Sequence, residues 1–352
     1  MLFLHNILQS ERLVEMMKKR YMRSLTALLT LGVLLLPTGC EEESPGTAKR
    51  AQEQRFFDLY MASTFMDTIE PPTASGLYYV EVTEGTGDIP DSADWLLVNY
   101  VGSTIPDDIV VDTYLENVAR DNNIYSENAM YGPFKLLNGT RTLGLTEGLM
   151  LMRKGGEAIL CFTSDLGYGS KGVDMMKSIS GYRSLRYEVE LLEVIKDMDA
   201  YEQAKIEAFV DTIAGADTIH DPVTDAVMYY VVDEEYPDST QVANDSLVSV
   251  AYRGYLPDGR EFDASSEGAP YEFPVGVYSD ERAPILGWHL GLTRFRKGEK
   301  GRLIIPYQMA YGALGRVSGQ YFAIQPYETL VFDIEVVSVG TDSGSDPGTD
   351  PQ

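Results

Sequence analysis

Three stretches in the last third of the chain decide its fold: I-L-G-W-H-L-G-L at residues 285–292, I-P-Y-Q-M-A-Y-G at 305–312 and E-T-L-V-F-D-I-E-V at 328–336. The first predicts a short helix over 286–293, and strand-like apolar runs lie within the other two. Aromatic residues and one acid recur in and around these stretches. They are Tyr252, Phe262, Asp263, Tyr271, Trp288, Tyr311 and Phe332.

An earlier part of the chain repeats this layout. Tyr100 stands 152 residues before Tyr252, and Tyr168 stands 143 residues before Tyr311, so the repeat is one domain long with a loop difference inside. Each copy follows an amphipathic helical stretch and then alternates strands with turns. We therefore predict an α+β fold of two tandem domains. The expected helices span 52–67, 198–213 and 286–293, and the expected strands span 77–82, 96–101, 158–163 and 186–194, then 228–232, 247–252, 301–306 and 329–339.

In order, spacing and flanking residues, these motifs resemble the FKBP-type peptidyl-prolyl cis-trans isomerases. In that family a curved antiparallel sheet wraps around one short helix. The resemblance is close over the last third of the chain and weaker over the earlier copy. It implies an FKBP-like isomerase domain over 223–340, a degenerate FKBP-like domain over 76–197, and a helical linker over 198–222.

The resemblance also implies that the aromatic residues line a dry pocket for a proline ring. Trp288 would be its floor, and the Tyr311 hydroxyl and the Ile285 backbone N–H would bind substrate carbonyls. Asp263 would lie at the pocket edge as a partly buried acceptor, kept ionised by donors such as the Tyr252 hydroxyl. Any one of these aromatic residues alone would more often belong to an ordinary core. The expected catalytic residues are Tyr252, Phe262, Asp263, Trp288, Tyr311 and Phe332, and the expected substrate contacts are Tyr271, Ile285 and Ile324, the last two at the rim.

The first copy departs from the family at the pocket positions. Leu145 replaces the floor tryptophan, Val111 replaces a wall phenylalanine, and Arg141 and Thr142 stand where the rim should be apolar. A wetter, shallower pocket loses the desolvation that the chemistry needs, so we expect this domain to be weak or inactive. In the second copy, residues 315–323 are longer than the common form, which we expect to affect specificity more than activity.

The N-terminus predicts export rather than a folded element. Basic residues at 18–23 precede an apolar run at 25–36, and the chain then reads L-P-T-G-C up to Cys40. This pattern is typical of a secretory signal and resembles a bacterial lipobox, which implies removal of residues 1–39 and acylation of Cys40. A plain signal peptide or an uncleaved anchor is the alternative.

The segments on either side of the two copies are acidic or of low complexity. We expect residues 40–75 to form an acidic linker and a helix, and residues 341–352 to be a disordered tail. The glutamates directly after Cys40 look like the surface-export signal of some bacteroidete lipoproteins, and a solvated linker explains them equally well.

The composition limits the kinds of partner and of site that the chain is expected to have. The formal net charge of −26 repels phosphates, so nucleic acid is a poor partner and membrane attachment would rest on the lipid. The three histidines have no neighbouring ligand at metal spacing, so we predict no metal, no cofactor and no Ser/His/Asp triad. Cys161 lies in a strand-like run and is expected to be a small core residue.

Two functions remain open on the sequence. The first is a peptidyl-prolyl isomerase with its chemistry in the second domain, acting on proline-containing polypeptides and assisting the folding of cell-envelope proteins. The second is a non-catalytic peptide-binding or holdase lipoprotein built from FKBP-like modules. The intact set of Phe262, Asp263, Trp288 and Tyr311 favours the first. We expect a monomer, lipid-anchored to a bacterial membrane, with the outer membrane favoured.

Overall fold

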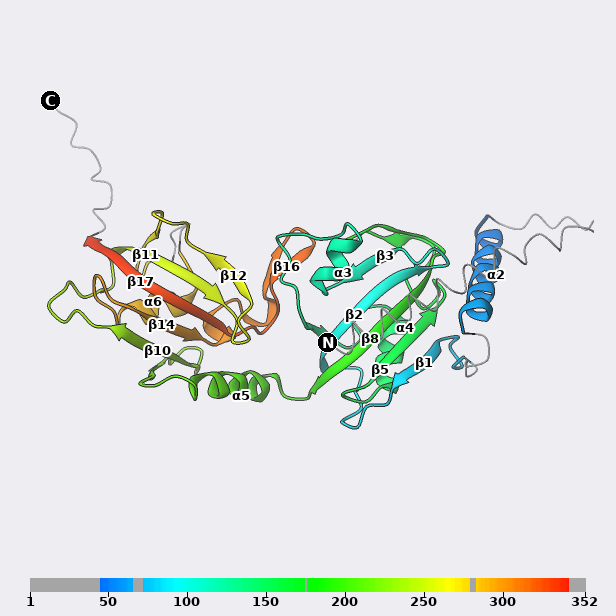
Figure 1. Cartoon of the computed structure of the whole chain (residues 1–352), viewed down its shortest axis with the longest axis horizontal. Coiled ribbons are helices and arrows are strands. Elements are labelled where there is room, and N and C mark those ends of the chain that lie inside the picture. Colours follow the sequence, from blue (N-terminus) through cyan, green and yellow to red (C-terminus); the bar gives the residue numbers. More distant parts are fainter. Residues whose placement is uncertain (1–44, 66–71, 175, 279–282, 342–352) are drawn as a thin grey trace, which may run out of the picture.

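The computed structural model describes residues 45–341, except 66–71, 175 and 279–282. Two sheets lie end to end along the long axis of the molecule, with an N-terminal helix beyond the outer side of the first (Figure 1). The expected signal segment, Cys40, the acidic tract beside it and the C-terminal tail beyond residue 341 lie outside the described residues.

The first sheet holds six antiparallel strands in the described part of the chain, in the order β1-β5-β8-β2-β3 with β4 paired to β2. We call this sheet and its helices the first domain. A two-stranded hairpin of β6 and β7 lies outside the sheet. The elements are β1 (Tyr78–Thr83), β2 (Trp95–Ile105), β3 (Val110–Thr113), α3 (Glu116–Asp121), β4 (Phe134–Leu137), α4 (Leu143–Leu151), β5 (Glu157–Phe162), β6 (Gly172–Val173), β7 (Ile179–Ser180) and β8 (Ser184–Ile195).

The second sheet has, among the described residues, seven strands in the order β12-β11-β17-β14-β10-β9, with β13 paired to β11. It forms the second domain together with one short helix, α6, and a separate hairpin of β15 and β16. The elements are β9 (Asp217–His220), β10 (Val227–Glu234), β11 (Ser246–Tyr255), β12 (Glu261–Ala264), β13 (Tyr271–Pro274), α6 (Leu286–Leu292), β14 (Lys300–Ile305), β15 (Arg316–Ser318), β16 (Tyr321–Ile324) and β17 (Leu330–Thr341).

The irregularities of the two sheets recur at the same places. The β2–β8 pairing shifts register between Leu97 and Val98, and the β11–β17 pairing shifts between Ser249 and Val250, at equivalent positions of the two copies. Further shifts recur in the β1–β5 and β10–β14 pairs and in the β2–β3 and β11–β12 pairs. Because bulges bend a strand at a defined point, the two sheets curve alike. The predicted α+β fold and the internal duplication are therefore confirmed.

A glycine in each central helix lets that helix lie close against its sheet. A Cβ atom on Gly287 would come within 2.4 Å of Ile305, and one on Gly144 within 2.5 Å of the Phe162 ring. Neither position has room for a side chain. The residue after each glycine is therefore held at the sheet: Trp288 in the second domain and Leu145 in the first, 3% exposed in both cases.

Helix α2 (Pro45–Phe65) is held on the first domain by a buried carboxylate. Glu53 accepts hydrogen bonds from the Ser164 backbone N–H at 2.7 Å, the Ser164 hydroxyl at 2.6 Å and the Ser184 hydroxyl at 2.9 Å. Phe57 and Cys161 pack in one cluster beneath the helix, so Cys161 is a free, buried core residue as expected. In the described part of the chain, no helix is long and apolar enough to cross a membrane.

Residues 198–222 do more than link the two domains. Helix α5 (Met198–Val210) packs through Ile206 against Tyr255, Ile304 and Val331 of the second domain. Strand β9 then pairs with β10 at the edge of the second sheet. The sequence predicted the helix but not this strand, because the glycine and aspartates before it favour a turn and only pairing with β10 makes it extended.

Candidate functional site

The aromatic residues singled out from the sequence meet on one side of the second domain. They contact the same hydrophobic core, and we call them the Trp288 cluster. Tyr252 comes from β11, Phe262 from β12, Tyr271 from β13, Trp288 from α6, Phe332 from β17, and Tyr311 from the turn between two 3₁₀ helices, η1 (Tyr307–Met309) and η2 (Gly312–Leu314).

Trp288 is the centre of this cluster. Its ring centroid lies 5.0 Å from that of Tyr252, 5.1 Å from that of Phe332 and 6.2 Å from that of Tyr271, each ring nearly perpendicular to it. Phe262 meets Phe332 edge to face at 5.5 Å. Edge-to-face pairs are a favoured arrangement of aromatic rings. Because Trp288 is buried while Tyr252, Phe262 and Tyr271 are half-buried, the cluster has an apolar floor and partly open walls.

The acid at the border of the cluster bonds to one of its walls. The Tyr252 hydroxyl donates a hydrogen bond to Asp263 Oδ2 at 2.9 Å. Burial, and then this bond, raise the pKa of Tyr252 well above its ordinary value, so the hydroxyl keeps its proton. The expectation of a partly buried Asp263 is wrong: its side chain is exposed, because β12 is the edge strand of the sheet.

The remaining expected residues lie around the same core. Ile285 directly precedes α6 and is half-buried, and Tyr311 is half-buried with the Arg316 guanidinium 5.8 Å from its ring centre. Ile324 is only 2% exposed and belongs to the core, so it does not form an open rim. Ile285 is the more accessible of the two expected rim residues.

Two positioning residues were not singled out from the sequence. Ser265 Oγ accepts from the Tyr252 backbone N–H at 2.9 Å and donates to the Tyr252 carbonyl at 3.3 Å, which fixes the backbone under that wall. His289 Nδ1 accepts from the Gly276 N–H at 2.9 Å, which joins α6 to the end of β13. Burial lowers the pKa of His289. The only indication of these two residues in the sequence was that they stand close to Asp263 and Trp288 of the pocket motifs.

The equivalent site in the first domain is filled by a charged pair. The Tyr100 hydroxyl donates to Asp112 Oδ1 at 3.0 Å, as Tyr252 does to Asp263, but Asp112 is 2% exposed. Arg141 lies 3.3 Å from its other carboxylate oxygen. Burial raises the pKa of Asp112 although Arg141 opposes this. With Leu145 in place of the tryptophan, this site offers a guanidinium and a carboxylate where the second domain offers aromatic rings.

The chemistry open to the Trp288 cluster is that of an apolar surface with aimed hydroxyl groups. The Tyr252 hydroxyl bonds to the Asp263 carboxylate, but its raised pKa keeps it protonated and makes it a poor nucleophile. Within the part of the chain that the structure describes, no group of three or more His, Cys, Asp or Glu side chains could hold a metal ion. Such a site suits a reaction that is governed by desolvation and binding rather than by proton transfer.

Comparison with known proteins gives matches over both sheets. The sequence profile of the FKBP-type peptidyl-prolyl cis-trans isomerase family matches residues 87–192 and 238–337. FK506-binding protein 1 of Saccharomyces cerevisiae is 39% identical over 94 residues, which are 26% of this chain and 75% of that protein. FK506-binding protein 2 of Yarrowia lipolytica is 42% identical over 100 residues, 28% of this chain and 64% of that protein. FkpA of Escherichia coli K12 is 45% identical over 94 residues, 26% of this chain and 30% of that protein.

Proposed function

The chain belongs to the FKBP-type peptidyl-prolyl cis-trans isomerase family, and from this premise we propose that its second domain carries the catalysis while its first does not. The observation that carries the proposal is the contrast between the two sites. The Trp288 cluster offers a dry aromatic floor, whereas Arg141 and Asp112 put an ion pair at the same place in the first domain.

The reaction needs no proton transfer. Rotation about an X–Pro bond is opposed by a barrier of about 18–20 kcal/mol, because amide resonance is lost at the twisted geometry. The planar amide is the more polar form, so water stabilises it over the twisted one. An apolar site against Trp288, Phe332 and Phe262 removes that water and lowers the barrier. An acceleration of 10³- to 10⁵-fold requires roughly 4–7 kcal/mol.

Two donors hold the substrate in this account. The Tyr311 hydroxyl and the Ile285 backbone N–H each bind a carbonyl of the bent peptide, and Ile285 borders the proline ring. Tyr252 forms a wall whose orientation is held by Asp263 and Ser265. The buried Ile324 side chain packs in the same core as Trp288 and supports the floor from within that core.

The clients we propose are proline-containing polypeptides of the cell envelope. The chain would act as a lipid-anchored monomer on a bacterial membrane, held through an acylated Cys40, and its net charge of −26 disfavours nucleic acid and anionic lipid as partners. Fractionation of cells that express the chain or Cys40→Ser tests the anchor. Recovery of Cys40→Ser in the soluble fraction, with the unaltered chain in the membrane fraction, is the expected result.

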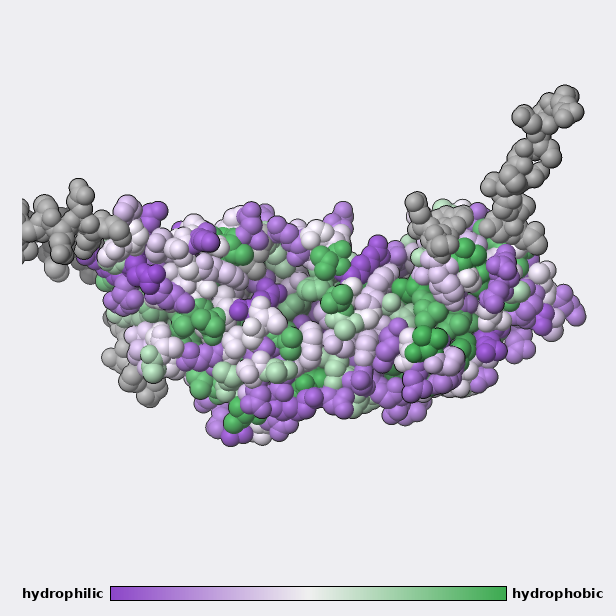
Figure 2. All heavy atoms as spheres, turned by 180° about the vertical axis from the view of Figure 1, so that it is seen from behind, coloured by the Kyte–Doolittle hydropathy of each residue, from purple (hydrophilic) through white to green (hydrophobic). Residues whose placement is uncertain are grey.

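A second candidate function is a non-catalytic holdase. Hydrophobic side chains gather over the C-terminal half on the face seen in Figure 2. Beside the site, Leu314 and Val317 are 83% and 59% exposed, which suits the binding of unfolded chains. Aggregation suppression by Trp288→Leu, together with no acceleration by the unaltered chain, would favour this candidate.

A protease-coupled proline isomerisation assay on the chain from residue 41 onward tests the main proposal. Trp288→Leu gives the second domain the residue that the first has, and we expect kcat/KM to fall at least tenfold, which corresponds to about 1.4 kcal/mol of transition-state stabilisation. Tyr252→Phe and Tyr100→Phe form a matched pair, since each removes a tyrosine hydroxyl that donates a hydrogen bond to an aspartate. A loss confined to Tyr252→Phe assigns catalysis to the second domain; equal rates for Trp288→Leu and the unaltered chain would refute the assignment.

A further inference from the structure

The first domain makes direct contact with a hairpin that borders the Trp288 cluster. Strands β15 and β16 form this hairpin, and Figure 1 shows β16 (orange) between the two sheets. Its first residue, Arg316, lies over Tyr311, and its last, Ile324, packs in the core with Trp288. One end of the hairpin is therefore part of the site, and its position affects the space above the aromatic floor.

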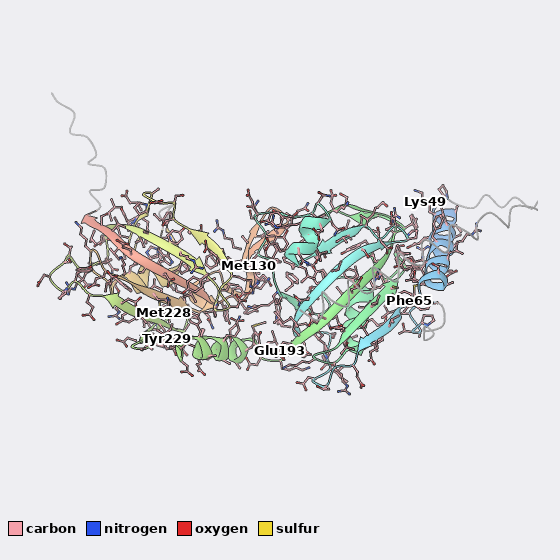
Figure 3. All side chains as sticks on the ribbon, viewed as in Figure 1. Lys49, Phe65, Met130, Glu193, Met228 and Tyr229 are labelled. Carbon is pink, nitrogen blue, oxygen red and sulfur yellow. The ribbon has the colours of Figure 1, made fainter. Side chains whose placement is uncertain are left out.

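A short segment of the first domain, residues 130–135, lies along this hairpin. The Met130 N–H donates to the Phe322 carbonyl at 2.8 Å, and Figure 3 places Met130 at the junction of the two sheets. The side-chain amide of Gln325 then bonds twice to the segment. Its oxygen accepts from the Lys135 N–H at 2.8 Å and its nitrogen donates to the Pro133 carbonyl at 3.1 Å. One of these bonds joins backbone to backbone and two join backbone to a side-chain amide, so they fix the position of the hairpin relative to residues 130–135 closely.

The hairpin also places a phenylalanine against the degenerate site of the first domain. The Phe322 ring lies 6.0 Å from Phe134, which stacks on Tyr114 at 4.3 Å. Tyr114 also hydrogen-bonds to the Phe322 backbone. On the same Phe134, Arg141 lies 5.4 Å from the ring centre and Tyr100 lies 6.1 Å away. The aromatic residues left in the first site thus contact a side chain of the second domain.

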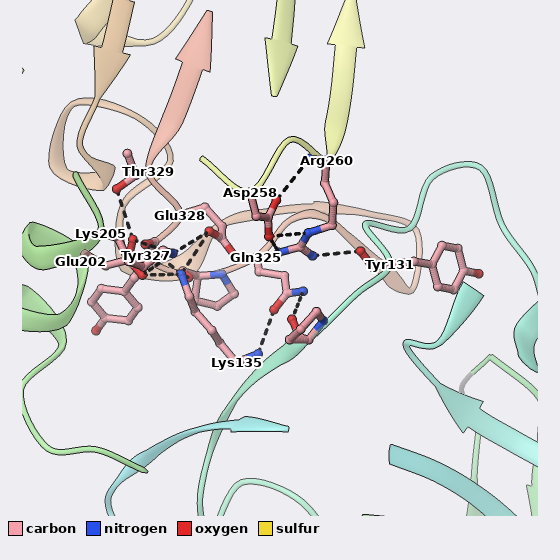
Figure 4. Close-up of polar contacts among 12 residues, drawn as sticks. Tyr131, Lys135, Glu202, Lys205, Asp258, Arg260, Gln325, Tyr327, Glu328 and Thr329 are labelled. Atoms are coloured by element: carbon pink, nitrogen blue, oxygen red, sulfur yellow. Dashed lines mark hydrogen bonds and ion pairs between the residues drawn. The ribbon is translucent and has the colours of Figure 1, made fainter. Parts of the chain in front are cut away.

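A buried ionic network holds the base of the same junction (Figure 4). Lys135 Nζ lies 2.8 Å from Glu202 and 3.2 Å from Glu328, and all three side chains are 2–3% exposed. The same ammonium donates to the carbonyls of Pro326 and Tyr327, at 3.2 and 3.0 Å. Those two residues directly follow Gln325, so the network fixes the chain where it leaves the hairpin.

The turn before β12, which also borders the site, contacts the same segment of the first domain. Arg260 donates from one guanidinium nitrogen to the Tyr131 carbonyl at 2.9 Å, and it stands in the turn that leads into Phe262 and Asp263. The first domain therefore contacts two segments that border the Trp288 cluster: the turn before β12 and the hairpin after Tyr311.

We propose that the first domain acts as a positioning domain, which uses its degenerate site to hold the β15–β16 hairpin of the second domain in the arrangement that binds substrate. Phe322, Gln325 and Tyr114 are positioning residues, since they act through the hairpin and not on the reacting amide. This inference rests on the proposed function, because it assumes that the Trp288 cluster is the working site.

The consequence is a change in substrate binding when the contact is lost. A hairpin released from the first domain samples other arrangements, and the apparent dissociation constant rises by the inverse of the competent fraction. If that fraction falls to about a tenth, KM rises about tenfold with little change in kcat. A variant that only loosened the overall fold would lower the amount of active protein and leave KM unchanged.

The test is steady-state isomerisation by the chain from residue 41 onward, carrying Gln325→Ala or Phe322→Ala. Gln320→Ala is the matched control, because it makes the same substitution as Gln325→Ala at an exposed position of the same hairpin. We expect KM to rise about tenfold in both junction variants and to stay unchanged in the control. An unchanged KM in Gln325→Ala and Phe322→Ala, while Trp288→Leu still lowers kcat/KM at least tenfold, would overturn this inference alone.

A double-mutant cycle separates positioning from direct client contact. Tyr114→Phe removes a hydroxyl that bonds to the hairpin backbone and that is buried in the first domain, out of reach of a client. If Phe322 acts through the first domain, Tyr114→Phe and Phe322→Ala are non-additive in their effect on KM. Additive effects, or no effect of Tyr114→Phe, would overturn the proposal. If Trp288→Leu retains full activity, the proposed function has failed instead.

Discussion

Replacement of Lys135 by methionine should strongly destabilise the chain. Lys135 Nζ is within 3.2 Å of two carboxylates and two backbone carbonyls, in surroundings that leave it 2% exposed. Methionine fills much of the same volume but carries no charge and donates no hydrogen bond. Glu202 and Glu328 would then share only Lys205, whose Nζ lies 3.0 and 3.6 Å from them.

The magnitude follows from the burial of the remaining charges. Removal of one partner of a buried ion pair costs about 3–5 kcal/mol, because the other partner is left without compensation. Unfolding entropy is about 2.1 cal/mol/K per residue, so for a chain of 352 residues that unfolds as one unit each kcal/mol lowers the melting temperature by roughly 1–2 °C. Lys135→Met should therefore lower the melting temperature by roughly 3–10 °C.

Scanning calorimetry measures this loss, with Lys300→Met as the control. Lys300 lies 3.5 Å from Glu234 in an ion pair whose side chains are 44% and 50% exposed, so its loss should cost at most about 1 kcal/mol. A further variant, Lys135→Met with Glu202→Gln and Glu328→Gln, should recover most of the loss, because it removes the uncompensated charges. Equal melting temperatures for Lys135→Met and Lys300→Met would refute the reasoning.

Two further predictions concern buried titratable groups. His289 has a pKa lowered by burial from its ordinary 6.5, so the unfolded chain takes up a proton before the folded one does as the pH falls. The contribution of His289 to stability is complete above pH 6.5 and declines below it. His289→Asn keeps an acceptor for the Gly276 N–H but does not titrate in this range. The melting temperature of this variant should therefore drop less between pH 7 and pH 5 than that of the unaltered chain. Cys161 has a pKa raised from 9.0 to about 12 by burial. In the chain from residue 41 onward, which lacks Cys40, Ellman's reagent should therefore modify this thiol roughly a thousandfold more slowly in the folded state than in denaturant. The assignment of His289 would be contradicted if the melting temperature fell equally between pH 7 and pH 5 in the unaltered chain and in His289→Asn. The assignment of Cys161 would be contradicted by rapid labelling of this thiol in the folded chain.

The sequence by itself was enough to predict the family, the duplication and the α+β class. Helix and strand periodicity, glycines and prolines act over a few residues, so the predicted elements agree with the observed ones within a few positions at most ends. The expected elements did not include strand β9 or the short elements β3, α3, β4, β6, β7, β12, β13, β15 and β16. Strand β9 was not expected because its extended form depends on pairing with β10. The bond from Tyr252 to Asp263 was anticipated, but the exposure of Asp263 was not, since it depends on β12 being the edge strand.

The junction between the domains was decided only by the tertiary structure. Lys135 and Gln325 are 190 residues apart in the chain, and a lysine in a strand is by itself expected at the surface. Nothing local to Lys135 indicates that Glu202 and Glu328 will surround it, and nothing local to Phe322 indicates that Phe134 will meet its ring. Periodicity reports which face of an element is apolar, whereas the partner of that face is set by how the two domains pack, which no short stretch of sequence encodes.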